Sequence, residues 1–158
     1  VFSGNRAGLS DGEGIANCIA GLNRLMPSAE RNGVTLCMEM LNSKVDHRDY
    51  HADHTAWAVE VAKGVASPHF RLLYDVYHMQ VMEGDVIATM RANLPWIAHV
   101  HTAGVPGRNE IDARQELNYR GIATFLADAG FGGVVAHEFI PKGDGVAALR
   151  EAVATCGV

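Results

Sequence analysis

Short apolar runs alternate with longer amphipathic segments along this chain, and Gly, Pro, Asn or Asp marks most of the changes between them. An apolar run of roughly four to eight residues predicts a buried strand, and a longer amphipathic segment predicts a helix. Strands are expected at Val1–Gly4, Val34–Leu41, Phe70–Tyr77, Trp96–Thr102 and Val134–Phe139. Helices are expected at Gly14–Arg31, Asp53–Val65, Gly84–Asn93, Asn118–Ala129 and Asp144–Ala154. The pattern therefore predicts a repeating βα order.

Strands that alternate with helices predict one α/β domain with a parallel sheet, either an open doubly wound sheet or a (β/α)8 barrel. The ionisable residues separate these two folds. Four successive strands carry such a residue near their carboxyl ends, namely Glu39, Asp75, His101 and Glu138. In a closed barrel these ends converge on one mouth, whereas an open sheet spreads them along an edge. The pattern therefore favours a (β/α)8 TIM barrel.

The length of the chain limits how much of a barrel it can form. A complete barrel has eight strands in about 250 residues. This chain has 158 residues and begins at Val1, inside an expected strand. We therefore expect a single domain, residues 1–158, that holds the C-terminal five βα units, strands 4 to 8 of the barrel. Such a domain is N-terminally incomplete by roughly 100 residues.

Composition excludes several classes of protein. The chain has 13 Lys+Arg against 18 Asp+Glu, a formal net charge of −5, and no basic run to neutralise phosphates, so no nucleic-acid partner is expected. Its 3 Cys lie far apart without CxxC spacing, which argues against a disulfide framework and a thiolate zinc site. No apolar run approaches the ~20 residues that cross a bilayer, so no membrane is expected. A cytoplasmic location is the default expectation, and any export signal would precede Val1.

The carboxylates at the expected strand ends point to a metal ion. An unpaired ionised carboxylate in a dry site costs several kcal/mol, and a shared cation removes this cost. Glu39, Asp75 and Glu138 offer hard oxygen ligands, His101 offers an imidazole nitrogen, and no thiolate belongs to the set. Such ligands suit Mg²⁺ or Mn²⁺ better than a structural zinc ion. We therefore expect these four residues to bind one divalent metal ion.

Two histidine motifs extend this prediction. In Asp75-Val-Tyr-His78 the imidazole follows the carboxylate on the expected loop, where it can reach a substrate oxygen beside the metal. In His99-Val-His101 the period of two places both rings on one face of the strand, with His101 nearer the mouth. His99 is expected in the core or behind the ligands. Histidines in loops and at helix starts are expected in solvent, namely His47, His51, His54 and His69.

The loop after His101 and the two glutamates indicate the chemistry. Arg108 offers a planar guanidinium that suits a carboxylate or paired substrate oxygens, and a surface arginine is the alternative. Glu39 and Glu138 lie on strands three positions apart, so in a barrel they face each other over metal and substrate. Two opposed carboxylates can move a proton between adjacent carbons while a metal stabilises an ene-diolate. This predicts an isomerase or epimerase of a small hydroxy-carbonyl compound, with Glu39 and Glu138 as catalytic residues.

The same residues belong to a wider set of motifs, which resembles the hydroxypyruvate isomerase group of the xylose isomerase-like TIM barrel superfamily of sugar isomerases and epimerases. The motifs extend over essentially the whole chain, and they are Glu39-Met-Leu-Asn42, Tyr74-Asp75-Val-Tyr-His78-Met-Gln80, Met82-Glu83-Gly84-Asp85, His99-Val-His101, Val105-Pro-Gly-Arg108, Glu116-Leu-Asn118-Tyr119 and His137-Glu138-Phe139. The resemblance implies that the four strand-end residues bind the metal and that Glu39 and Glu138 also transfer the proton. It further implies that His78 and Arg108 bind oxygens of a small hydroxy-carbonyl or sugar substrate. Homo-oligomerisation stays open.

Two departures from the hydroxypyruvate isomerase pattern keep a second activity open. His101 stands where these isomerases often carry Gln, and the His is more like the ketose 3-epimerases. Asn109 replaces the His expected after Arg108. A ketose 3-epimerase is therefore the alternative to an isomerase.

Two further readings of the sequence are less favoured. Endonuclease IV-like phosphodiesterases look similar in their Glu, Asp-x-x-His and His, but they need extra zinc ligands that include an Asp-x-His. The loop here offers Asn109-Glu-Ile-Asp112-Ala-Arg114 and no such pair, and the charge of −5 is wrong for DNA. The other reading is a metal-binding relic without turnover.

Overall fold

The computed structural model describes residues 1–158, and its centre is a sheet of parallel strands. The strands are β1 (Leu36–Glu39), β2 (Phe70–Asp75), β3 (Ile97–Thr102) and β4 (Val134–His137), and they pair in the order β1-β2-β3-β4. Sequential order in a parallel sheet requires each connection to cross over the same face. The sheet therefore has the topology of consecutive βα units in a barrel wall, and the barrel prediction is confirmed to that extent.

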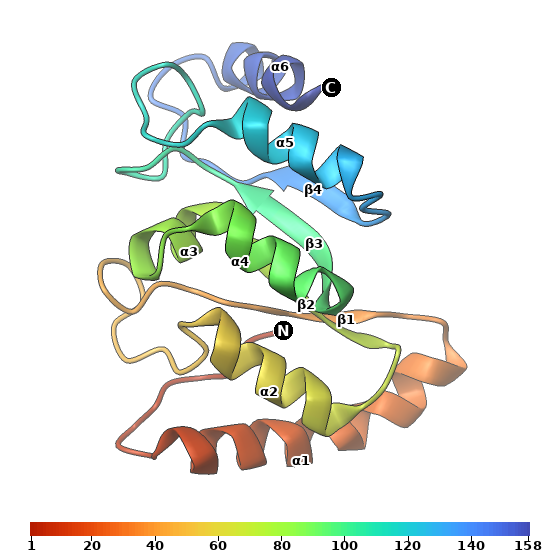
Figure 1. Ribbon diagram of the computed structural model, residues 1–158. Helices are drawn as coiled ribbons and strands as arrows, with labels where there is room; N and C mark the ends of the chain where they lie inside the picture. The colour runs from red at the N-terminus through yellow and green to blue at the C-terminus, as the bar shows by residue number, and fades with distance from the viewer.

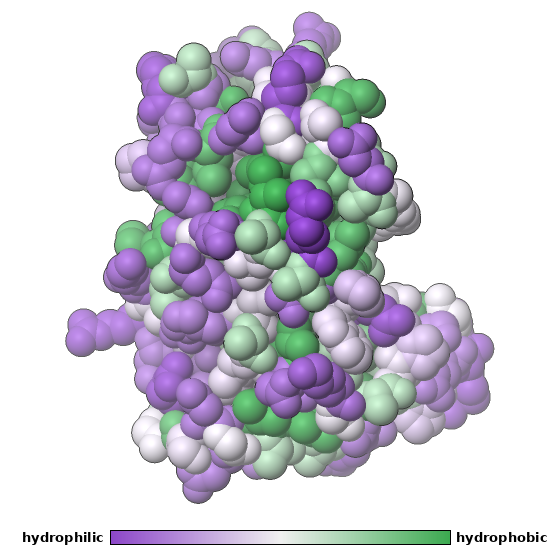
Figure 2. Space-filling model, in the orientation of Figure 1, coloured by the Kyte–Doolittle hydropathy of each residue, from purple (hydrophilic) through white to green (hydrophobic).

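Six α-helices accompany the sheet. They are α1 (Asp11–Arg31), α2 (Thr55–Val65), α3 (Val76–Met82), α4 (Val86–Asn93), α5 (Tyr119–Asp128) and α6 (Gly145–Cys156), with a short 3₁₀ turn, η1 (Leu94–Trp96), before β3. Figure 1 shows α2, α4 and α5 in a row in front of the strands. On this helix-covered side, polar side chains predominate and apolar ones lie between them (Figure 2). No helix is long and apolar enough to cross a membrane.

The first helix begins where a capping signal stands in the sequence. The Ser10 hydroxyl accepts a hydrogen bond from the N–H of Glu13 at 3.3 Å, and the Glu13 carboxylate accepts one from the N–H of Ser10 at 2.9 Å. This reciprocal pair is a capping box, which satisfies two N–H groups that the helix leaves free. Ser10 is therefore the N-cap of α1.

Successive side chains along each strand point to opposite faces of the sheet, and the two faces differ chemically. Leu72, Tyr74 and Val100 are fully buried among the residues of the main hydrophobic core, on the helix side. The intervening residues point to the other face, where the register pairs Leu73 with His99 and Asp75 with His101. The face away from the helices therefore carries the ionisable residues, as in the interior of a barrel.

Three expectations about element boundaries are wrong. Val1–Gly4 forms no strand, although the amine of Val1 donates to the Cys37 carbonyl at 2.8 Å and the N–H of Glu39 donates to the Val1 carbonyl at 3.1 Å. The predicted strand Phe70–Tyr77 ends at Asp75, because α3 starts at Val76. The helix α3 therefore occupies the end of the expected strand and the expected loop after it, whereas α4 corresponds to the expected helix Gly84–Asn93.

The start of α3 has a local cause. The Oδ1 atom of Asp75 accepts hydrogen bonds from the N–H groups of Tyr77 at 2.8 Å and His78 at 3.2 Å. A carboxylate in this position is a helix N-cap, and it stops the strand by providing partners for the first turn of a helix. The apolar run continues past Asp75, so hydrophobicity alone conceals this boundary.

Candidate metal centre

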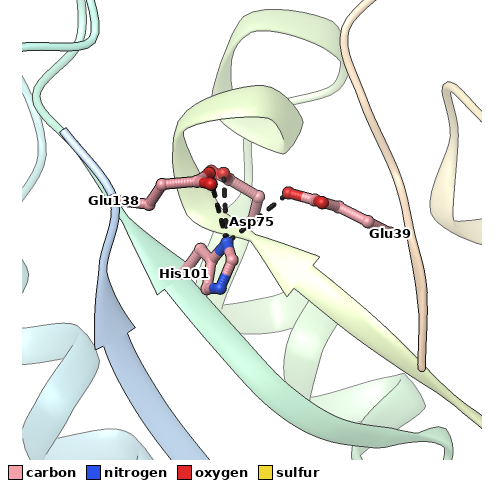
Figure 3. A group of neighbouring side chains, drawn as sticks. All are labelled: Glu39, Asp75, His101 and Glu138. Carbon is pink, nitrogen blue, oxygen red and sulfur yellow. Dashed lines mark ion pairs between the residues drawn. The ribbon is translucent and has the colours of Figure 1, made fainter. Parts of the chain in front are cut away.

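The four residues predicted as metal ligands meet at one point. Glu39, Asp75 and His101 end or nearly end strands β1, β2 and β3, and Glu138 directly follows β4. One ligand atom from each residue lies within 4.8 Å of the others. Figure 3 shows the carboxylates arranged around the imidazole, with Glu39 and Glu138 on opposite sides. Four side chains from distant parts of the sequence thus converge on the ionisable face of the sheet.

The Nδ1 atom of His101 is central to this group. It lies 3.3 Å from Oε2 of Glu138, 3.5 Å from Oε1 of Glu39 and 3.9 Å from Oδ2 of Asp75. These are spacings of charged groups around a shared centre, longer than the usual hydrogen bond of 2.7–3.2 Å. The imidazole nitrogen and one oxygen of each carboxylate therefore converge without making hydrogen bonds to one another.

Unsatisfied polar atoms mark the same position. Glu39 Oε1, Asp75 Oδ2 and His101 Nδ1 are buried and make no hydrogen bond. Buried polar atoms are nearly always paired, because an unpaired one costs free energy. Three oxygen donors and one imidazole nitrogen match the preferences of a hard or borderline divalent cation. The residues present therefore fit a divalent metal ion.

Burial and charge act in opposite directions on the carboxyl groups. Burial raises the pKa of Asp75 to about 7, even though the N–H of His78 and the charge of Arg108 favour its ionised form. Burial also acts to raise the pKa of Glu39, but the neighbouring His101 outweighs it and leaves that pKa below its usual value. Asp75 is therefore the carboxylate with the strongest need for a cation.

The same charges act on the imidazole of His101. Burial alone would lower the pKa of His101, yet Glu39, Glu138 and Asp75 around the ring raise it above its usual value. An excess of negative charge thus surrounds the ring. The cluster attracts a cation, whether a proton on His101 or a metal ion among the four side chains.

His78 lies on α3 rather than on a loop, which corrects the expectation for its position. The ring is fully buried, and its Nε2 atom is 3.8 Å from Oδ2 of Asp75. Burial, and then the charge of Arg108, lowers the pKa of His78 to about 3. The structure therefore places a neutral histidine directly behind the cluster, next to one of its carboxylates.

Arg108 belongs to the cluster and is not a surface arginine. Its Nη2 atom lies 2.5 Å from Oε2 of Glu138 and 3.8 Å from Oδ2 of Asp75. The guanidinium carbon is 5.7 Å from the centroid of the Tyr77 ring, within range of a cation–π contact. The residue has a left-handed φ of 57°. Both predicted substrate-binding residues, His78 and Arg108, thus adjoin the predicted metal ligands.

His99 lies where the period of two placed it. Its ring makes an edge-to-face contact with that of His101, with centroids 4.8 Å apart. The Nε2 atom of His99 is buried and makes no hydrogen bond. His99 therefore supports His101 from below, on the same face of the sheet.

Several residues near the site were not predicted from the sequence. A cavity of about 410 Å³ adjoins the cluster, and it is lined by Phe2, Glu39, Leu41, His47, Arg108 and Glu138. His47 was expected in solvent, yet its Nε2 atom is buried and its ring centroid lies 5.3 Å from that of His78. No periodic signal marks His47, because it stands in an irregular loop.

His51 also differs from its expectation, although it lies away from the cluster. The side chain is buried, stacks on Trp57 with centroids 4.9 Å apart, and places Nε2 at 3.2 Å from Asp11 Oδ1. Gly14 allows this packing, since a Cβ there would meet the ring at 2.0 Å. His51 is therefore part of the packing between α1 and the loop before α2.

The fold and the cluster together define a class of protein. A parallel sheet with helices on one face and ligands at the carboxyl ends of its strands is the architecture of TIM barrel enzymes. The sequence profile described as xylose isomerase-like TIM barrel matches residues 1–156. The chain belongs to this family.

Two curated proteins that resemble this chain are named as isomerases. A human protein provisionally named hydroxypyruvate isomerase is 34% identical over 112 residues, which are 71% of this chain and 40% of the human protein. The 2-oxo-tetronate isomerase of Cupriavidus necator is 30% identical over 115 residues, which are 73% of this chain and 44% of that protein. The chain thus spans less than half the length of these curated relatives.

Solved structures share the fold. A Brucella melitensis protein described as an AP endonuclease of family 2 superimposes with a TM-score of 0.89 at 29% identity, over 98% of this chain and 58% of that one. D-psicose 3-epimerase superimposes with a TM-score of 0.75 at 19% identity, over 95% of this chain and 59% of that one. The identity to the epimerase is low enough that this match supports the fold alone.

Proposed function

We propose that this chain supplies the metal ligands and the proton-transfer residues of an isomerase that interconverts a small hydroxy-ketone and a hydroxy-aldehyde, as in hydroxypyruvate isomerase. The observation that carries the proposal is the placement of Glu39 and Glu138 on opposite sides of a cluster that fits a divalent cation. The names of the curated relatives, hydroxypyruvate isomerase and 2-oxo-tetronate isomerase, support the same class of reaction.

The metal ion would be held by Glu39, Asp75, His101 and Glu138, with Mg²⁺ or Mn²⁺ as the best match to this ligand set. When bound, such an ion polarises carbonyl and hydroxyl oxygens and so makes the adjacent C–H more acidic. Asp75 also anchors α3 through its Oδ1 atom, so only Oδ2 faces the cluster.

Proton transfer falls to the two glutamates. In isomerisation a carboxylate takes a proton from one carbon, an ene-diolate forms, and a carboxylic acid returns a proton to the neighbouring carbon. Glu39 and Glu138 approach the shared centre from opposite sides, which allows one group to act at each carbon. The Nη2 atom of Arg108 lies 2.5 Å from Oε2 of Glu138, so the guanidinium can orient this carboxylate.

Substrate oxygens have two candidate partners. Arg108 presents N–H groups beside Glu138 and lines the cavity of about 410 Å³. Hydroxypyruvate and 2-oxo-tetronate both carry a carboxylate, which a guanidinium binds in a bidentate fashion. His78 is the second partner, at the side of Asp75. A ketose 3-epimerase remains the alternative, favoured by His101 in place of Gln.

A phosphodiesterase is less well supported, even though a structure described as an AP endonuclease superimposes closely. The four ligands form a single cluster, and the net charge of the chain is −5. Binding to DNA depends on neutralising phosphates with Lys and Arg, and the negative net charge of the chain opposes such binding.

The proposal is tested by NMR on the full-length protein in D₂O. Hydroxypyruvate, 2-oxo-tetronate and several ketoses are each incubated with Mn²⁺ or Mg²⁺, and then with a chelator. We expect deuterium at the carbon next to the carbonyl, a product of changed carbonyl position, and loss of both with chelator. An inverted centre at carbon 3 would instead establish the epimerase. Cleavage of abasic DNA, or no exchange with any substrate, would overturn the proposal.

A further inference from the structure

Asn42 lies beyond β1 and is fully buried behind the metal cluster. The orientation of its side-chain amide is fixed by the backbone. Its Oδ1 atom accepts hydrogen bonds from the N–H groups of Val45 at 3.1 Å and Asp46 at 2.8 Å. Since a backbone N–H can only donate, the amide oxygen must face these two groups and the NH₂ must face the other way.

The NH₂ group of Asn42 has two partners. It lies 2.7 Å from Oδ2 of Asp46 and 2.7 Å from Nδ1 of His78. Asp46 Oδ2 also accepts a hydrogen bond from the Tyr77 hydroxyl at 2.7 Å. The carboxylate of Asp46 therefore holds the amide from one side, and the remaining N–H of Asn42 is directed at the histidine.

The Nδ1 atom of His78 thus faces two donors. One is the NH₂ of Asn42, and the other is the backbone N–H of the same residue, at 3.2 Å. An imidazole nitrogen that accepts hydrogen bonds carries no proton, and in a neutral ring the proton then sits on the other nitrogen. His78 must carry its proton on Nε2.

The Nε2–H group has no acceptor within the protein. The atom is buried, makes no hydrogen bond, and is 3.8 Å from Oδ2 of Asp75. Such a group is available to a ligand oxygen that enters the cluster. A protonated Nε2 can neither ligate a metal ion nor accept a proton, so the tautomer decides what His78 can do.

We propose that Asn42 is a positioning residue that holds His78 in the Nε2–H tautomer, so that His78 serves the site as a hydrogen-bond donor to a substrate oxygen. The tautomer follows from the hydrogen bonds around Nδ1. Only the identity of the acceptor, a hydroxy-carbonyl oxygen, rests on the proposed function. Asn42 acts through His78 and does not itself touch the cluster.

The test uses the full-length protein labelled with ¹⁵N-histidine. Two-bond ¹H–¹⁵N NMR distinguishes a protonated ring nitrogen from an unprotonated one, and His78→Gln assigns the signals by their loss. In the wild-type protein we expect an unprotonated Nδ1 and a protonated Nε2 at neutral pH. A protonated Nδ1 in the wild type would overturn the inference.

A double variant exchanges the side chains of Asn42 and Asp46, which are hydrogen-bonded to each other. In Asn42→Asp/Asp46→Asn the amide and the carboxylate trade places, so the total charge and the hydrogen bond between positions 42 and 46 are kept. An acceptor then replaces the side-chain donor, which lies 2.7 Å from Nδ1 of His78, and only the longer contact of 3.2 Å from the backbone N–H of residue 42 remains. We expect Nδ1 to gain a proton. An unchanged Nδ1 would show that Asn42 does not set the tautomer. If the double variant does not fold, Asn42→Asp alone serves the same test, and we expect Nδ1 of His78 to gain a proton in it.

Tyr77→Phe is the matched control. It removes the hydroxyl at the far end of the network and leaves both donors to Nδ1 in place. We expect the His78 tautomer to stay as in the wild type. A shift of the proton in this variant would assign the effect to general disturbance of the network and not to Asn42.

Activity provides a separate readout. Loss of one donor to a reacting oxygen lowers kcat by about 100-fold or more, and the double variant should show this while it still binds Mn²⁺ like the wild type. If Nδ1 gains a proton in the double variant, an undiminished kcat there would overturn the donor role of His78. If the wild type itself shows no isomerisation, the proposed function fails, and the ring-nitrogen signals alone decide the role of Asn42.

Discussion

The hydroxyl group of Tyr119 donates a hydrogen bond to the carbonyl of Ala103 at 2.6 Å and accepts one from the N–H of the same residue at 3.0 Å. Both residues are buried, and Ala103 directly follows β3. One side chain from α5 thus satisfies both backbone groups of the first residue in the loop that carries Arg108. The loop is tied to the sheet at this point.

Removal of that hydroxyl should weaken the fold. Tyr119→Phe leaves a buried N–H and a buried carbonyl without partners, and each such loss costs about 1–3 kcal/mol. Since two groups lose their partner, we expect the free energy of unfolding in urea to fall by about 2–6 kcal/mol, with an unchanged m value. Tyr74→Phe is the matched control, because the Tyr74 hydroxyl is buried and makes no hydrogen bond. Equal losses in the two variants would contradict the role given to Tyr119.

Glu138 should be needed for proton transfer and dispensable for folding. Its side chain is half-exposed and lies outside the core, so Glu138→Gln should leave the thermal unfolding curve nearly unchanged. The amide cannot take up the proton, and general acid–base catalysis contributes about 100-fold or more. We expect substrate-dependent deuterium exchange to fall at least that far. Glu151→Gln, an exposed carboxylate on α6, should exchange like the wild type. Undiminished exchange in Glu138→Gln rules out the proposed role.

Asp75 should link metal binding to stability. With a chelator present, Asp75→Asn should be at least as stable as the wild type, since it removes a buried carboxylate whose Oδ2 has no partner and keeps an oxygen to cap α3. A ligand at 100 times its Kd stabilises the folded state by about 2.7 kcal/mol. We expect this gain from Mn²⁺ in the wild type and not in the variant, by urea unfolding.

The control for this comparison is Asp112→Asn, which changes a carboxylate outside the cluster. It should gain as much from Mn²⁺ as the wild type does. Equal stabilisation of Asp75→Asn by Mn²⁺ would mean that the ion binds elsewhere.

The capping box of α1 should give a stability that depends on pH. Hydrogen bonds from Ser10 to the carboxylate of Glu13 hold the pKa of Glu13 below its ordinary value of 4.5. A lowered pKa in the folded state means that the carboxylate stabilises the protein above pH 4.5 and that this contribution disappears as pH falls through the folded-state pKa. Glu13→Gln should therefore lower Tm at pH 7, and the difference should vanish once the pH lies well below the folded-state pKa of Glu13. A Tm difference that persists in acid would contradict this reading.

The clustering of the four candidate metal ligands could be predicted from the sequence because a simple rule places them. Each of Glu39, Asp75, His101 and Glu138 ends or follows an apolar run, and the ends of parallel strands meet at one edge. The approximate positions of most helices and strands followed from the same periodicity. These features depend on local pattern and on topology, which a sequence displays directly.

The surroundings of the ligands could not be predicted in the same way. The contact of Asn42 with His78 joins residues 36 positions apart through an irregular loop, and its geometry depends on two backbone N–H groups. His51 looked like a solvated loop residue, yet it packs against Gly14 and Trp57 from other elements. Such contacts arise from tertiary packing and leave no periodic trace.

The two oxygens of Asp75 have different partners. Oδ1 accepts hydrogen bonds from the backbone of α3, and Oδ2 faces the other candidate ligands. Position 75 is therefore subject to two separate demands, and any replacement chosen for its affinity for a cation also moves or removes the point where a helix begins. Glu138 caps no helix, so a replacement there changes its ion pair with Arg108 and the proposed metal binding and proton transfer, but leaves the helix starts in place.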